Sequence, residues 1–160
     1  MTKLLIVGER HSCNDCIAEQ IRLIRERYSE FSTLSFEYIT DVGNNAKILN
    51  SLNDHLDDYH KVLEPPKGEY TKREIPTWRR WLYLHKPVFE TALAVGIAVL
   101  PLKSMDDLEN SIEEVAKVSK RGLITIVGSA YAEMYEEDRS LIDLEYDVMI
   151  PHNHKCTSPA

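Results

Sequence analysis

Apolar residues recur along this chain in two spacings, and the alternation of the two predicts strands separated by helices. Strands are predicted at short apolar or alternating runs, which fall at 3–8, 34–40, 97–102, 123–127 and 146–150. Helices are predicted where apolar residues recur three and four positions apart, at 15–28, 46–63, 104–120 and 131–144, with a shorter one at the start of 89–102. Strands that alternate with helices indicate an α/β fold with a parallel or mixed sheet.

The length of 160 residues fits one α/β domain, which we place at 1–150, followed by a flexible tail at 151–160. Turn residues separate the second strand from the helix at 46–63, and prolines and a glycine end that helix near 64–68. The region 123–150 carries a second strand–helix–strand pattern, which we interpret as a C-terminal βαβ extension of the sheet.

Composition and charge narrow the classes of function. The chain is 43% hydrophobic and 28% charged, and its net charge of −7 argues against nucleic-acid partners and anionic membranes. The apolar stretch 91–102 is too short to span a bilayer, and Met1 leads directly into a strand-like run, so we expect neither a membrane anchor nor a signal peptide. A cytoplasmic, reducing location follows from these features, and there paired cysteines act as a dithiol or as metal ligands.

Two cysteines three positions apart lie where the first strand gives way to the first helix. Cys13 and Cys16 are therefore placed at a helix N-terminus, where unpaired N–H groups and the helix dipole favour a thiolate. The thiolate is the nucleophile in disulfide exchange, so this C-x-x-C predicts a redox-active dithiol. Two inert small residues, or metal ligands, would give the same spacing.

The segment from Lys3 to Ala46, with its apolar strand, C-x-x-C and helix, resembles the first βαβ unit of the thioredoxin superfamily. A second matching piece is Ile75-Pro76-Thr77, which is similar to the segment carrying the cis proline of that superfamily. The resemblance implies a thioredoxin-like mixed sheet flanked by helices, with the helix at 46–63 as an insertion. It also implies a thiol–disulfide oxidoreductase that needs no cofactor and acts on a protein or small-molecule disulfide. Cys13 would be the attacking thiol and Cys16 the resolving thiol, while Ile75, Pro76 and Thr77 would bind the substrate.

The strand ends support a different interpretation, a nucleotide- or nucleoside-binding protein with a Rossmann-like parallel sheet. Gly8 and Gly128 each close an apolar strand ahead of a helix, which is the usual place for a phosphate in α/β proteins. The polar residues that follow these strands could line a crevice there: Arg10, His11, Ser12 and Ser129. Nearby carboxylates could serve acid–base chemistry: Glu9, Glu133, Glu136, Glu137 and Asp138.

A third interpretation is a zinc-stabilised interaction module. The tail supplies three candidate ligands, His152, His154 and Cys156, which with Cys13 and Cys16 could form a tetrahedral site if the tail folds back. A disordered tail is the simpler explanation of the same residues.

The segment 70–87 mixes basic residues with aromatic ones, among them Trp78, Trp81 and Tyr83. Such residues can stack nucleic-acid bases, but they equally form cores and partner-binding surfaces.

Overall fold

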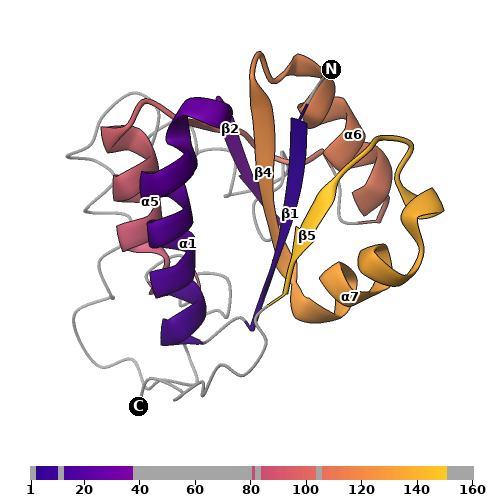
Figure 1. Ribbon diagram of the computed structural model, residues 1–160, viewed down its shortest axis with the longest axis horizontal. Helices are drawn as coiled ribbons and strands as arrows, with labels where there is room; N and C mark the ends of the chain where they lie inside the picture. The colour runs from indigo at the N-terminus through magenta and orange to yellow at the C-terminus, as the bar shows by residue number, and fades with distance from the viewer. Residues whose placement is uncertain (1–2, 11–12, 38–80, 82–83, 104–105, 151–160) are drawn as a thin grey trace, which may run out of the picture.

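The computed structural model describes residues 3–10, 13–37, 81, 84–103 and 106–150, and it shows an α/β fold built on one five-stranded sheet (Figure 1). Every paired neighbour is parallel, and the strand order is β3-β2-β4-β1-β5. The strands are β1 (Lys3–Glu9), β2 (Thr33–Phe36), β3 (Ala98–Val99), β4 (Gly122–Gly128) and β5 (Asp147–Met149).

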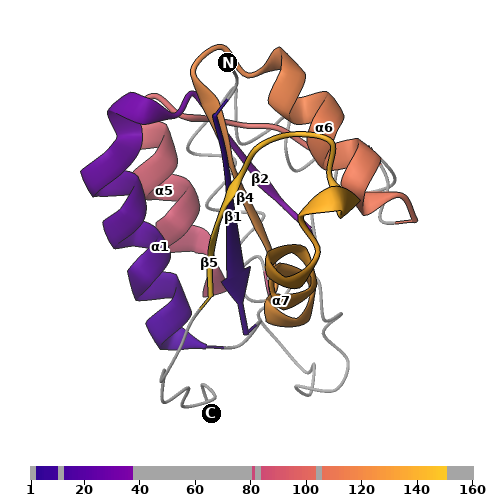
Figure 2. The same cartoon turned by 45° about the vertical axis from the view of Figure 1, so that its right-hand side comes forward.

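Helices cover both faces of the sheet. Those of the described residues are α1 (Asn14–Arg27), α5 (Lys86–Ala94), α6 (Leu108–Val118) and α7 (Ser129–Glu137), with short 3-10 turns at Tyr28–Glu30 and Arg139–Leu141. Helices α1 and α5 lie against one face, and α6 and α7 lie against the other (Figures 1 and 2). None of these helices combines the length and apolar character needed to cross a membrane.

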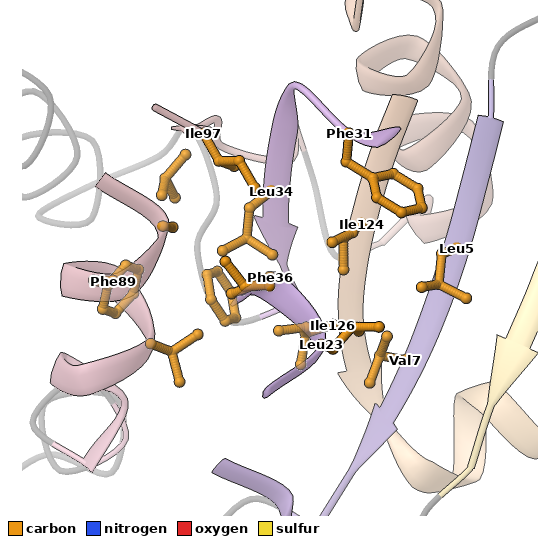
Figure 3. Close-up of a cluster of buried hydrophobic side chains, with 14 of the residues drawn as sticks. Leu5, Val7, Leu23, Phe31, Leu34, Phe36, Phe89, Ile97, Ile124 and Ile126 are labelled. Carbon is orange, nitrogen blue, oxygen red and sulfur yellow. The ribbon is translucent and has the colours of Figure 1, made fainter. Parts of the chain in front are cut away.

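The strands divide their side chains between two hydrophobic cores. On β1, Leu5 and Val7 belong to the core beneath α1 and α5, whereas Leu4 and Ile6 belong to the core beneath α6 and α7. This two-residue period follows from the pleat of a strand. Figure 3 shows the first core, in which the Phe36 ring contacts the Phe89 ring at a centroid distance of 5.0 Å.

The thioredoxin-like mixed sheet expected from the C-x-x-C resemblance is wrong, and the alternative Rossmann-like parallel sheet is confirmed. Strand β4 shows why, because its side chains are buried on both faces and its sequence is continuously apolar, as in the centre of a parallel sheet. The C-terminal βαβ unit is therefore not an extension. It supplies the central strand β4, between β2 and β1, and the edge strand β5.

Several predicted elements are shorter in the structure. The strand expected at 97–102 comprises only Ala98–Val99. The helix expected at 104–120 begins at Leu108, because the Asp107 side chain accepts a hydrogen bond from the Asn110 N–H at 3.4 Å and so caps it. The helix expected at 131–144 ends at Glu137, where the chain turns through the 3-10 segment. The helix expected at 46–63 lies outside the described residues.

Candidate functional site

The carboxyl ends of β1 and β4 meet at one edge of the sheet. Glu9 is in register with Gly128, and Gly8 with Val127. From this edge β1 continues towards α1 on one face, while β4 continues into α7 on the opposite face (Figure 2). In open parallel sheets such a divergence is the point where ligands bind. The two strand-end glycines singled out in the sequence thus do lie on neighbouring strands.

Glu9 is a buried acid at this edge, only 2% exposed. Its Oε1 accepts a hydrogen bond from Trp81 Nε1 at 2.7 Å. Its Oε2 accepts from Gln20 Nε2 at 2.6 Å and lies 2.6 Å from His85 Nε2. Carboxylates are seldom buried unless they are paired and hydrogen-bonded, and Glu9 meets both conditions.

Trp81 organises the groups around Glu9. Besides its indole N–H, its main-chain oxygen lies 2.8 Å from His85 Nδ1, and its ring stacks on the His85 ring with centroids 4.0 Å apart. Phe36 packs edge-on against both rings. The Trp81 side chain is 3% exposed, so of the interpretations of the basic–aromatic segment it supports a core role at this position. Trp78 and Tyr83 lie outside the described residues.

The two cysteines begin α1 beside this cluster. Cys13 is the N-cap residue, and its N–H donates to the Arg10 carbonyl at 3.0 Å. Cys13 is 1% exposed and Cys16 2%, so both side chains are buried. Cys13 is disulfide-bonded and Cys16 is outside any disulfide, so the two sulfurs are not bonded to each other.

The environment of Cys16 disfavours its thiolate. Burial raises the pKa of the Cys16 thiol, and the charges of Glu9 and Asp15 add to the rise. A hydrogen bond to the Arg10 backbone and the charge of Arg10 act in the opposite direction, but the net shift is upward. Because the Glu9 charge acts on the Cys16 thiol, the C-x-x-C lies close to the cluster around Glu9.

A second buried acid, Glu37, directly follows β2 and is 4% exposed. Its N–H donates to the Ile126 carbonyl at 2.8 Å, which places it beside the end of β4. Burial raises the pKa of Tyr135 on α7, and the charges of Glu109 and Glu37 raise it further. The charge of Glu37 thus affects a residue on the α6–α7 face of the sheet. Glu9 instead bonds to side chains on the α1–α5 face.

No protein-family profile matches this chain, and comparisons with curated proteins and with solved structures found no match. The geometry of the site is therefore the basis on which we infer a function.

Part of the predicted site lies within the described residues. Arg10 is exposed just after β1, and Ser129 is the first residue of α7. The predicted positions His11, Ser12, Ile75, Pro76, Thr77, His152, His154 and Cys156 lie outside the described residues. Within the part of the chain that the structure describes, no three histidine, cysteine or acidic residues are grouped as they would be to hold a metal ion.

The sequence interpretation missed Gln20, His85 and Glu37 and weighed Glu9 only as one acid among several. The sequence carries a signal for three of these four residues, Glu9, Glu37 and Gln20. Glu9 and Glu37 each follow an apolar strand directly, where a polar residue stands at the carboxyl edge of the sheet. Gln20 stands four residues after Cys16, on the buried face of α1.

A hollow of about 1120 Å³ opens near the start of β1, lined by residues that include Lys3, Arg139 and Tyr146. The Arg139 guanidinium is occupied within the fold, because it donates to the Tyr146 carbonyl and lies 4.9 Å from the centre of its ring. None of the residues predicted from the sequence to form a site lines this hollow. We therefore place the candidate site at the carboxyl edge.

Proposed function

We propose that this protein is an α/β enzyme that binds a small molecule at the carboxyl ends of β1 and β4, with Glu9 as its acid–base group. The observation that carries the proposal is the burial of Glu9 in register with Gly128, with nitrogen atoms of three side chains around its carboxylate: Gln20 on α1, and Trp81 and His85 just before α5. Acids held in place in this way at the edge of a parallel sheet are candidates for proton transfer.

A nucleoside or nucleotide is the ligand class that we propose for this site. No side chain caps the first turn of α7, which starts beside Glu9 and has no acidic residue, and such an N-terminus favours a phosphate. The negative charges of the buried acids Glu9 and Glu37 disfavour the binding of an anion at the same edge. Arg10 supplies a positive charge next to Glu9, so we assign it the role of holding a phosphate.

We expect a nucleoside monophosphate and its matching nucleoside both to raise the melting temperature, because a ligand that binds the native state stabilises it. Arg10→Ala should weaken the monophosphate about tenfold, the loss of one charge-assisted hydrogen bond, and leave the nucleoside unchanged. Thermal-shift titrations of four base-matched pairs measure both effects. Arg25→Ala is the control, since Arg25 is exposed at the far end of α1.

Two results would contradict this proposal. One is the absence of any thermal shift across the four pairs. The other is an equal loss for nucleoside and monophosphate in Arg10→Ala, which would mean that Arg10 supports the fold instead of binding the phosphate.

A thiol–disulfide oxidoreductase is the second candidate, and it is favoured by the position of Cys16. Cys16 is a reduced, buried thiol one turn after Cys13, and burial raises its pKa, as suits a resolving thiol. In the proposed exchange the Cys13 thiolate attacks a substrate disulfide and releases one substrate thiolate. Cys16 then attacks the Cys13 sulfur, which closes the Cys13–Cys16 disulfide and releases the second thiolate.

For this second candidate we expect Cys13→Ser to abolish the reduction of insulin by the fully reduced protein, because the attacking sulfur is gone. Cys16→Ser should instead accumulate a mixed disulfide between Cys13 and the substrate, which mass spectrometry detects. Cys156→Ser is the matched single-thiol control and should retain turnover. Activity that survives Cys13→Ser would rule out the dithiol mechanism.

A further inference from the structure

Both ring nitrogens of His85 face oxygen atoms. Nδ1 lies 2.8 Å from the Trp81 carbonyl oxygen, and Nε2 lies 2.6 Å from Glu9 Oε2. A carbonyl oxygen only accepts hydrogen bonds, so Nδ1 carries a proton. The short contact on the other side needs a second proton, either on Nε2 or on the Glu9 carboxyl. His85 and Glu9 together therefore hold one proton more than a neutral imidazole and a carboxylate would.

The neighbours of Glu9 decide where this extra proton lies. Trp81 Nε1 donates to Oε1, and Gln20 Nε2 donates to the same Oε2 that faces His85. Donors of this kind stabilise the ionised carboxylate over the protonated acid. The Trp81 ring also lies face to face with the imidazole at an interplanar angle of 21°, and an indole face favours a cationic partner.

We infer that His85 is an imidazolium held by an ionised Glu9, and that this buried pair is the proton donor of the proposed site. His85 is 0% exposed, so bulk water does not reach the ring directly. When Glu9 passes a proton to the bound ligand, the proton comes from His85 Nε2 along the 2.6 Å contact. The ring is left neutral with its Nδ1 proton in place, and Glu9 is again a carboxylate.

With the ring neutral, the bare Nε2 and Glu9 Oε2 are two acceptors at hydrogen-bond distance, which is unfavourable in a buried site. The other ionisable groups named at this region are Cys16, a neutral thiol with a raised pKa, and the exposed Arg10. Among the described residues, Trp81 and Gln20 are neutral donors to Glu9, so the imidazolium carries the positive charge beside it. Trp81 and Gln20 are thus positioning residues for the proton.

Gln20 makes a Glu9→Gln variant informative. The Oε1 atom of Gln20 is buried and accepts no hydrogen bond from the described residues. In Glu9→Gln the new amide can donate to His85 Nε2, and the Gln20 amide can turn so that its Oε1 accepts from the new amide. The variant keeps the shape and the hydrogen bonds of the cluster but removes the reason for the positive charge on His85.

The experiment is nitrogen-15 NMR of ligand-free protein labelled at histidine, at pH 7.5. We expect two protonated ring nitrogens for His85 in the wild type. In Glu9→Gln we expect Nδ1 still protonated and Nε2 shifted to the position of an unprotonated nitrogen. The other five histidines are internal references. Glu26→Gln, at an exposed position of α1, should leave the His85 signals unchanged.

The inference fails if wild-type His85 shows an unprotonated Nε2 together with the infrared C=O stretch of a protonated carboxylic acid that disappears in Glu9→Gln. It also fails if His85 is equally charged in both proteins. If the variant does not fold, the wild-type spectrum alone decides between the two states. The charge on His85 is measured without ligand, so its outcome is separate from the thermal shifts that test the proposed function, on which the proton-donor role depends.

Discussion

Replacing Glu9 with leucine should lower the free energy of unfolding by about 3–5 kcal/mol, because the change removes one partner of a buried, hydrogen-bonded pair. The donors of Trp81, His85 and Gln20 would lose their shared acceptor inside the fold. Glu9→Gln should cost less than half as much, since an amide of the same size can bond to all three. Urea denaturation measures the free energy of unfolding of both variants. A loss of stability lowers the midpoint urea concentration and leaves the m-value unchanged.

The matched control for this comparison is Glu26→Leu, which removes an exposed carboxylate from α1 and should change stability by no more than about 0.5 kcal/mol. If Glu9→Leu were as stable as the wild type, the hydrogen bonds around Glu9 would contribute nothing to the fold. Equal losses in Glu9→Leu and Glu9→Gln would show that the charge matters and the hydrogen-bond pattern does not.

Phe36→Ala should also lower the free energy of unfolding by about 3–5 kcal/mol, the usual range for truncating a buried phenylalanine to alanine. Phe36 is 0% exposed, and its ring contacts Trp81 at 5.1 Å and Phe89 at 5.0 Å between centroids. The cavity would also remove the edge contact that supports His85. Equilibrium denaturation of the variant and the wild type measures this decrease in the free energy of unfolding.

Two control variants test whether the effect of Phe36→Ala comes from the lost core volume. Phe36→Leu keeps most of the apolar volume and should cost about 1–1.5 kcal/mol. Val118→Ala truncates a side chain that is 69% exposed and should be nearly neutral. A Phe36→Ala variant that loses less than 1 kcal/mol would mean that the core beneath α1 and α5 closes over the gap.

The α/β class could be predicted from the sequence because hydrophobic period is a local property. The continuous apolar run at 123–127 predicts a strand, and β4 lies there with its side chains buried on both faces. The expectation of a thioredoxin-like sheet failed for a related reason. A strand, a C-x-x-C and a helix make the same local βαβ unit in either fold, and only the order and direction of distant strands distinguish them.

The candidate site was predictable only where it belongs to strand ends. Gly8 and Gly128 mark the ends of apolar runs, and parallel pairing brings such ends to one edge. The cluster on Glu9 was not predictable, because its members Gln20, Trp81 and His85 come from segments up to 76 residues from Glu9 in the sequence. Their side chains meet through tertiary packing, to which no local spacing corresponds.

The strand order also has a consequence for how the chain folds as it is synthesised. β1 pairs with β4 and β5, which begin at Gly122 and Asp147, and β2 pairs with β3 and β4. A nascent chain that has left the ribosome only as far as α5 thus exposes two apolar strands whose sheet partners among the described residues are not yet synthesised. Such a high contact order slows folding, to roughly milliseconds or longer. We expect the first half of this protein to depend on chaperones until its last third emerges.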